Sequence, residues 1–118
     1  MAEILVLDDV LDAVVLISKI LERKGHSVTV FTGEEEAIAY ARDNDVDLAI
    51  LDIKLKKMSG IQVLAELKKV SPGIKAIMLT GYPTIETARE AIDLGAGAYC
   101  VKPIDKKELE EKVEQVLG

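Results

Sequence analysis

The residues of this sequence that could do chemistry are aspartates that follow apolar segments. Asp52 ends the apolar run 48–51, and Asp8 with Asp9 ends the run 4–7. A carboxylate in such a position is costly to desolvate unless its charge is used there. We therefore take Asp52 as the chemical centre of the protein.

Three carboxylates in one partly desolvated site would repel one another. Either one of them is protonated or a divalent cation lies among them. Oxygen ligands from several loops suit Mg²⁺, which keeps some of its waters. Thr80 and Lys102 also follow apolar segments. A cation, a carboxylate, an ammonium group and a hydroxyl together are apparatus for phosphoryl transfer, with Asp52 as nucleophile and an aspartyl phosphate as product.

Alternating strands and helices must position these groups. The apolar runs predict five strands, over residues 4–7, 27–31, 48–51, 74–79 and 98–101. Amphipathic patterns between and after them predict five helices. Apolar strands that alternate with helices, joined by right-handed crossovers, favour a doubly wound α/β fold. Its working site lies beyond the carboxyl ends of the strands, where the candidate residues converge if the first, third, fourth and fifth strands are adjacent.

Capping patterns predict where the helices begin. Asp9 is expected to cap the first helix, and Thr32 with Glu35 forms a capping-box pattern before the second. The remaining helix starts are expected at Ser59 with Gln62, at Pro83-Thr84, and at Asp105 with Glu108. The acidic run 34–36 is expected to complement a helix dipole.

Length and composition are those of one ordinary domain. The chain has 118 residues, 49% of them hydrophobic and 31% charged, and no apolar stretch approaches the roughly 18 residues of a membrane span. The net charge of −6 argues against direct nucleic-acid binding. A single cysteine, Cys100, and the lack of a signal peptide favour a cytoplasmic location.

Five short motifs, in order and each at a strand or helix end, resemble the receiver domain of two-component response regulators. They are Leu7-Asp8-Asp9, Leu51-Asp52, Met58-Ser59-Gly60, Leu79-Thr80-Gly81 and Val101-Lys102-Pro103. The resemblance covers essentially the whole chain. It implies a flavodoxin-like fold with five parallel strands in the order 2-1-3-4-5 and five helices. It also implies one receiver domain over residues 1–118, with no output domain in this chain.

The resemblance implies a metal site and a phosphoacceptor. Asp52 would accept the phosphoryl group, and Mg²⁺ would be held by the side chains of Asp9 and Asp52 and the backbone carbonyl of Lys54. Asp8 would act through metal-bound water. Lys102 would pair with the acceptor carboxylate and later with the phosphoryl group.

The resemblance also implies a switch. Thr80 would donate its hydroxyl to a phosphoryl oxygen, and Tyr99 matches an aromatic switch position in the fifth strand. The bond between Lys102 and Pro103 would be cis. Side chains expected to modulate the chemistry are Lys54, Tyr82 and Pro103.

The function implied is a phosphorylation-activated switch of a phosphorelay. A sensor histidine kinase or a phosphotransfer protein would supply the phosphoryl group. The domain would catalyse its own phosphorylation and dephosphorylation and would not otherwise be an enzyme. Its signal would leave through the fourth helix, fifth strand and fifth helix, toward an effector, an output domain or a second copy in a homodimer. Neither nucleic acid nor a membrane is an expected partner.

The sequence departs from the family at three positions. Val10 stands where a polar residue is frequent, and Ile104 stands where phenylalanine is frequent. Lys57 replaces a common proline, which predicts a more mobile loop after the acceptor.

Two other functions remain open at this point. The domain could be a docking module that works without phosphorylation. It could also be an enzyme or cofactor carrier on a similar fold. A dehalogenase-type phosphatase would need an aspartate where Lys54 stands, and a flavin carrier would need Ser, Thr or Gly where Asp8 and Asp9 stand.

Overall fold

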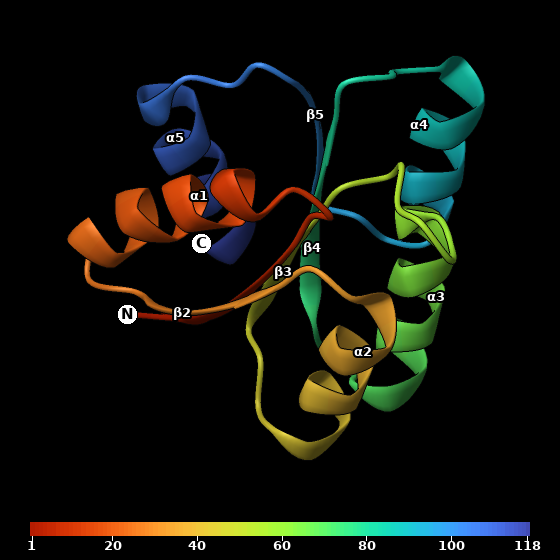
Figure 1. The fold of residues 1–118 in the computed structure, drawn as a ribbon, viewed down its shortest axis with the longest axis horizontal. Coiled ribbons are helices and arrows are strands. Elements are labelled where there is room, and N and C mark those ends of the chain that lie inside the picture. Colours follow the sequence, from red (N-terminus) through yellow and green to blue (C-terminus); the bar gives the residue numbers. More distant parts are fainter.

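The computed structural model describes residues 1–118 as a five-stranded parallel sheet between two layers of helices (Figure 1). The strands are β1 (Glu3–Leu7), β2 (Ser27–Phe31), β3 (Leu48–Leu51), β4 (Lys75–Thr80) and β5 (Ala98–Val101). The helices are α1 (Leu11–Arg23), α2 (Glu34–Asp43), α3 (Gly60–Val70), α4 (Ile85–Asp93) and α5 (Lys106–Leu117). None of these helices is long and apolar enough to cross a membrane. The strand order β2-β1-β3-β4-β5 confirms the doubly wound, flavodoxin-like fold.

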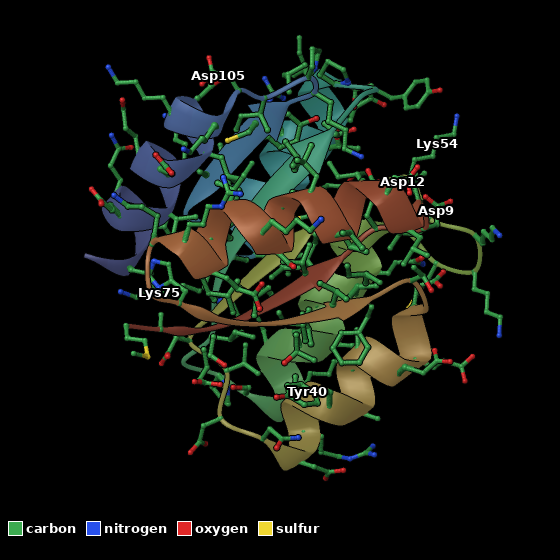
Figure 2. The ribbon with its side chains drawn as sticks, turned by 60° about the vertical axis from the view of Figure 1, so that its left-hand side comes forward. Asp9, Asp12, Tyr40, Lys54, Lys75 and Asp105 are labelled. Carbon is green, nitrogen blue, oxygen red and sulfur yellow. The ribbon has the colours of Figure 1, made fainter.

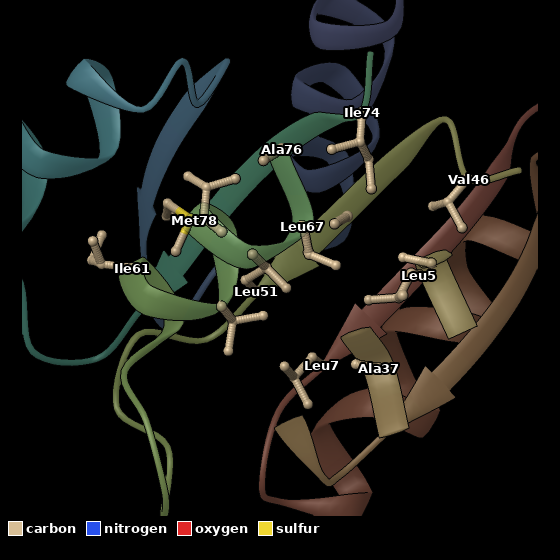
Figure 3. Packing of buried hydrophobic residues seen from close by; sticks show 14 of the residues in the cluster. Leu5, Leu7, Ala37, Val46, Leu51, Ile61, Leu67, Ile74, Ala76 and Met78 are labelled. Carbon is tan, nitrogen blue, oxygen red and sulfur yellow. The ribbon is translucent and has the colours of Figure 1, made fainter. Parts of the chain in front are cut away.

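Alternate side chains along the strands supply two separate cores. Leu5 and Leu7 of β1 pack in a cluster with residues of α2, α3 and α4, part of which is shown in Figure 3. Ile4 and Val6 pack on the other face with α1 and α5. β3 is buried along its whole length in the middle of the sheet. Each large aliphatic side chain so buried contributes roughly 1.5–3 kcal/mol, so both faces hold the central strands firmly.

Three predicted helix starts are confirmed. Ser59 and Gln62 form a reciprocal capping box, in which Ser59 Oγ accepts the Gln62 N–H at 3.2 Å and Gln62 Oε1 accepts the Ser59 N–H at 2.9 Å. Thr84 caps α4 and Asp105 caps α5, each by accepting the N–H of the residue three positions on. These side chains satisfy N–H groups that the helix itself leaves free.

The predicted cap of the first helix is wrong. Its N-cap is Val10, which makes no side-chain cap, and the helix begins at Leu11. The reason is that the preceding turn uses a different aspartate, since Asp8 Oδ1 accepts the Val10 N–H at 3.0 Å. Asp9 is left out of the helix, and its carboxylate lies with those of Asp8 and Asp52.

The capping box predicted before the second helix is also wrong. The N-cap of α2 is Gly33, one residue after Thr32, and it has no side-chain cap. Glu35 turns outward instead, where its carboxylate lies 3.4 Å from Lys57 Nζ in an exposed ion pair.

The end of the fourth strand lies one residue beyond the predicted boundary. β4 includes Thr80, whose carbonyl accepts the Lys102 N–H at 2.7 Å and so joins the ends of β4 and β5. The bond between Lys102 and Pro103 is cis, as the resemblance implied. Cys100, just before this turn, is buried, and burial raises the pKa of its thiol.

Candidate functional site

The carboxyl edge of the sheet brings the three aspartates together. Leu7 pairs with Leu51 in the register of β1 and β3, so the residues after both strands emerge at the same level. Asp8, Asp9 and Asp52 each place a carboxylate oxygen within 4.8 Å of the others. Asp8 and Asp52 are buried, and Asp9 is half-buried. The convergence predicted from the strand ends is therefore present.

Lys102 supplies the positive charge at this cluster. Its Nζ lies 2.5 Å from Asp8 Oδ2 and 3.5 Å from Asp52 Oδ2, so the close ion pair is with Asp8 and Asp52 is the more distant partner. Burial by itself lowers the pKa of the Lys102 ammonium. The hydrogen bond and charge of Asp8, and then the charge of Asp52, outweigh it and raise that pKa above its ordinary value. The lysine is held in its charged form.

The surroundings of the Asp52 carboxyl disfavour its ionised form. Burial, and then repulsion from Asp8, raise its pKa above the ordinary value, although Lys102 and the backbone N–H of Lys54 act in the opposite direction. One ammonium group does not balance three carboxylates. The donor set is all oxygen and partly buried, which fits a hard divalent cation such as Mg²⁺.

A cavity of about 430 Å³ opens onto Asp52. Its lining residues include Asp9, Asp52, Lys54, Tyr82 and Lys102. In Figure 2, Asp9 and Lys54 lie at the same end of the molecule, beyond the sheet.

Thr80 lies next to this cavity and does not line it. It is completely buried, and its Oγ1 accepts the Tyr82 N–H at 2.9 Å. It lines a neighbouring hollow of about 370 Å³, which also contacts Lys54 and Tyr82. The structure therefore brings Thr80 beside the site with its hydroxyl engaged by backbone.

Lys54 and Tyr82 separate the two hollows. Lys54 Nζ lies 4.2 Å from the centroid of the Tyr82 ring, a cation–π contact. Both side chains are exposed and both line each hollow. They stand where side chains would control the access of water or a donor.

Tyr99 connects the fifth strand to the start of α4. Its hydroxyl lies 2.7 Å from Thr87 Oγ1 and accepts the Thr84 N–H at 3.3 Å. Its ring packs at the edge of the core around α2, α3 and α4. The position is suitable for a side chain that senses movement of α4.

Two features of the site were missed by reasoning from the sequence. Glu34 is buried, and one of its oxygens accepts the N–H groups of both Lys57 and Met58. Its position in an acidic helix start indicated only a dipole interaction. The N-cap Val10 and the helix residues Leu11 and Leu16 of α1 are exposed, although amphipathicity alone predicts a polar outer face for the helix.

A model of the response regulator receiver domain family matches residues 4–114. Among curated proteins, the transcriptional regulatory protein ZraR of Salmonella typhimurium is 33% identical over 116 residues, which are 98% of this chain and 26% of that protein. The sporulation initiation phosphotransferase F of Bacillus subtilis is 27% identical over 98% of this chain and 93% of its own length. The chain thus spans about a quarter of the first of these relatives and nearly all of the second.

Solved structures are similar over the whole chain. A CheY-like receiver domain protein from Methanospirillum hungatei has a TM-score of 0.95 and 34% identity, with 99% of this chain and 94% of that chain covered. A response regulator from Burkholderia pseudomallei, solved with a phosphorylated aspartic acid, a calcium ion and citrate, has a TM-score of 0.88 and 29% identity. That match covers all of this chain and 67% of the other.

Proposed function

This chain belongs to the response regulator receiver domain family, and we propose that Asp52 is its phosphoacceptor in a Mg²⁺-dependent reaction that the domain itself catalyses. The donor is a phosphohistidine on a sensor histidine kinase or a phosphotransfer protein. The observation that carries the proposal is the Asp52 carboxyl, buried among Asp8, Asp9 and Lys102 at the mouth of a cavity. A charge in that place is unfavourable unless a cation and a phosphoryl group make use of it.

The residues present can hold the ion and the transferring group. Asp9, Asp52 and the carbonyl of Lys54 would hold Mg²⁺, with Asp8 acting through water. The ion supplies positive charge that neutralises the phosphoryl oxygens. An oxygen of Asp52 attacks phosphorus in line, so that an O–P bond forms as the N–P bond of the donor breaks. Lys102 Nζ is close to both Asp8 and Asp52, so its ammonium group can move from the carboxylates to an oxygen of the phosphoryl group.

The phosphoryl group then shifts the equilibrium between two packing arrangements of the domain. The Thr80 hydroxyl, which now accepts the Tyr82 N–H, turns to donate to a phosphoryl oxygen. The segment that leads from Thr80 into α4 moves with it. Tyr99 is tied to the start of α4 through Thr84 and Thr87, so it moves when that helix start moves. Lys54, Tyr82 and Pro103 modulate the lifetime of the phosphate.

The signal leaves through the face formed by α4, β5 and α5. Ile85, Ile92 and Val101 are exposed apolar side chains on α4 and β5. This surface fits an output domain, a separate effector or a second copy of the chain.

The donor approaches over α1. Leu11 and Leu16 expose apolar side chains on that helix, and Leu16 lines an apolar groove of about 360 Å³ that also contacts Lys102 and Pro103. A protein that delivers a phosphoryl group to Asp52 would cover this surface, because it borders the acceptor cavity.

Acetyl phosphate with Mg²⁺, followed by measurement of the intact mass, tests the proposal. The wild-type protein should gain the mass of one phosphoryl group, and the Asp52→Asn variant should gain none. No adduct on the wild-type protein, or an adduct that survives in Asp52→Asn, would contradict the assignment of Asp52.

A further inference from the structure

We propose that Glu34 is a positioning residue for the acceptor site, because its buried carboxylate holds the loop after β3 in the conformation that presents the Lys54 carbonyl. The inference rests on the proposed function only through the metal site. Glu34 lies in the first turn of α2, on a different element from every residue assigned to the chemistry.

The contacts of Glu34 are unusually complete for a glutamate at a helix start. Its side chain is 4% exposed, and Oε2 accepts the Lys57 N–H at 2.5 Å and the Met58 N–H at 3.0 Å. Burial by itself raises the pKa of this carboxyl. The backbone N–H groups of Met58 and Lys57, together with the N–H of Glu34 itself and the charge of Lys57, outweigh burial, so the net pKa lies below the ordinary value and the group stays ionised. We refer to these two hydrogen bonds as the Glu34 clamp.

The clamp is the only tether of its kind on this loop. The backbone of residues 54–58 makes no other hydrogen bond to a helix or strand. The base of the loop is closed separately, since the Gly60 N–H donates to the Ile53 carbonyl at 2.7 Å. Glu34 therefore fixes the backbone of residues 57 and 58, while Leu55 and Met58 add apolar contacts with the core.

The middle of the loop matters because Lys54 lies on it, between the acceptor and the clamped residues. Lys54, Lys56 and Lys57 also place three ammonium groups on this short segment. The buried Glu34 carboxylate is close enough to Lys57 for the charge of that lysine to lower the pKa of Glu34. Glu35 meets Lys57 Nζ in an ion pair in which both side chains are about three-quarters exposed, and such pairs stabilise little.

Two substitutions at position 34 test separately the length of the side chain and its charge. Glu34→Asp keeps the charge but is too short to reach both N–H groups, and Glu34→Gln keeps an acceptor oxygen at full length without the charge. Glu35→Gln is the matched control, with the same loss of charge one residue away in the first turn of α2. Mg²⁺ affinity of each folded variant is measured by titration of backbone amide resonances.

The expected change in Mg²⁺ affinity follows from the effect of groups that hold a metal ligand in place. Loss of such a partner typically weakens metal binding 10–100-fold. Glu34→Asp should lose about that much Mg²⁺ affinity, Glu34→Gln should lose less, and Glu35→Gln should stay within about twofold of the wild type. Equal affinities in Glu34→Asp and Glu35→Gln would overturn the proposal.

Amide hydrogen exchange tests the clamp without metal or phosphate. The Lys57 and Met58 amides of the wild-type protein should be protected, and Glu34→Asp should remove that protection while the α3 amides keep theirs. Fast exchange of both amides in the wild type would overturn the inference. So would failure of both Glu34 variants to fold, because the side chain would then serve the whole fold. Phosphorylation of wild-type Asp52 by acetyl phosphate is scored separately, so the proposed function and the clamp can fail independently.

Discussion

Lys102 lies nearer to Asp8 than to Asp52: its Nζ is 2.5 Å from Asp8 Oδ2 and 3.5 Å from Asp52 Oδ2. The lysine therefore neutralises the Asp8 carboxylate of the aspartate cluster first. Asp52 keeps a negative charge that burial and Asp8 both disfavour.

Neutralising Asp52 should stabilise the fold. The pKa of Asp52 is raised above its ordinary value of 3.8 in the folded protein, so its ionised form opposes folding at neutral pH. Asp52→Asn should raise the melting temperature at pH 7. The gain should shrink as the pH falls through the raised pKa and vanish below 3.8, where Asp52 is protonated in both states.

Thermal unfolding between pH 3 and pH 8 in Mg²⁺-free buffer measures this effect. The exposed Asp45 makes no ion pair or hydrogen bond, so Asp45→Asn is the control and should leave the melting temperature nearly unchanged. A lower melting temperature of Asp52→Asn at pH 7 would contradict the predicted repulsion.

Mg²⁺ should stabilise the unphosphorylated domain through the same carboxylates. An ion at 100 times its dissociation constant adds about 2.7 kcal/mol to the free energy of unfolding when it binds only the folded state. Asp9→Asn should remove most of that gain. Asp12→Asn, which neutralises an exposed carboxylate on the first turn of α1, should keep it (Figure 2). Melting curves with MgCl₂, at constant ionic strength, make the comparison, and equal gains in both variants would exclude Asp9 as a ligand.

Substitutions on α1 should distinguish a protein donor from a small donor. Leu11→Ser and Leu16→Ser change exposed side chains, so stability should change by less than about 0.5 kcal/mol. Phosphorylation of Asp52 by acetyl phosphate should be unaffected. Transfer from a histidine kinase that phosphorylates the wild type should slow about tenfold, which corresponds to about 1.4 kcal/mol of lost docking energy. Equal slowing with both donors would place the leucines in the chemistry and not in docking.

Tyr99→Phe should loosen the start of α4. The change removes the contact with Thr87 Oγ1 and the acceptor of the Thr84 N–H, at a cost of about 1 kcal/mol. Amide resonances of α4 in the unphosphorylated variant should shift toward their positions in the phosphorylated wild type. The control is Tyr40→Phe, which removes a hydroxyl of α2 that accepts a hydrogen bond from Thr29 of β2. This change should leave the α4 resonances in place. Unshifted α4 resonances in Tyr99→Phe would argue against a switch at this position.

Gly60→Ala should be strongly destabilising. A Cβ at this position would collide with the backbone carbonyl of Asp52 and lie 2.9 Å from Ile53 Cα. Overpacking of this kind costs roughly 1–3 kcal/mol, and the backbone on both sides of the contact leaves little room to relax. Gly73→Ala meets nothing within 4 Å and serves as the control in denaturant unfolding. Equal stability of the two variants would show that the acceptor loop can move away from α3.

The central strands β1, β3 and β4 were predictable because each is a short apolar run that is buried almost throughout, whereas the edge strands β2 and β5 are mostly half-buried. β2, β3 and β5 match their predicted bounds, and β4 is displaced by one residue because Thr80 joins the ladder through its carbonyl. The convergence of Asp8, Asp9 and Asp52 was predictable for the same reason, since strand ends of a parallel sheet meet at one edge.

The errors occur where one polar group had a choice of partners. Asp9 could have capped α1, but its carboxylate lies in the cluster with Asp8 and Asp52. Glu34 could have stayed in solvent as a dipole partner, yet it accepts N–H groups 23 and 24 residues further along the chain. Such pairings depend on how two helices pack, and periodicity carries no information about that packing. The preference of Lys102 for Asp8 over Asp52 is of the same kind.

Cys100 is the only thiol of the chain, is 4% exposed, and has a pKa raised by burial. Thiol-directed dyes and spin labels react with exposed thiolates, so the native protein should be silent to them. A cysteine introduced at the exposed Ile92 of α4 would then carry a single reporter in an otherwise unaltered background. The motion of that helix could be followed in real time without first removing a native residue.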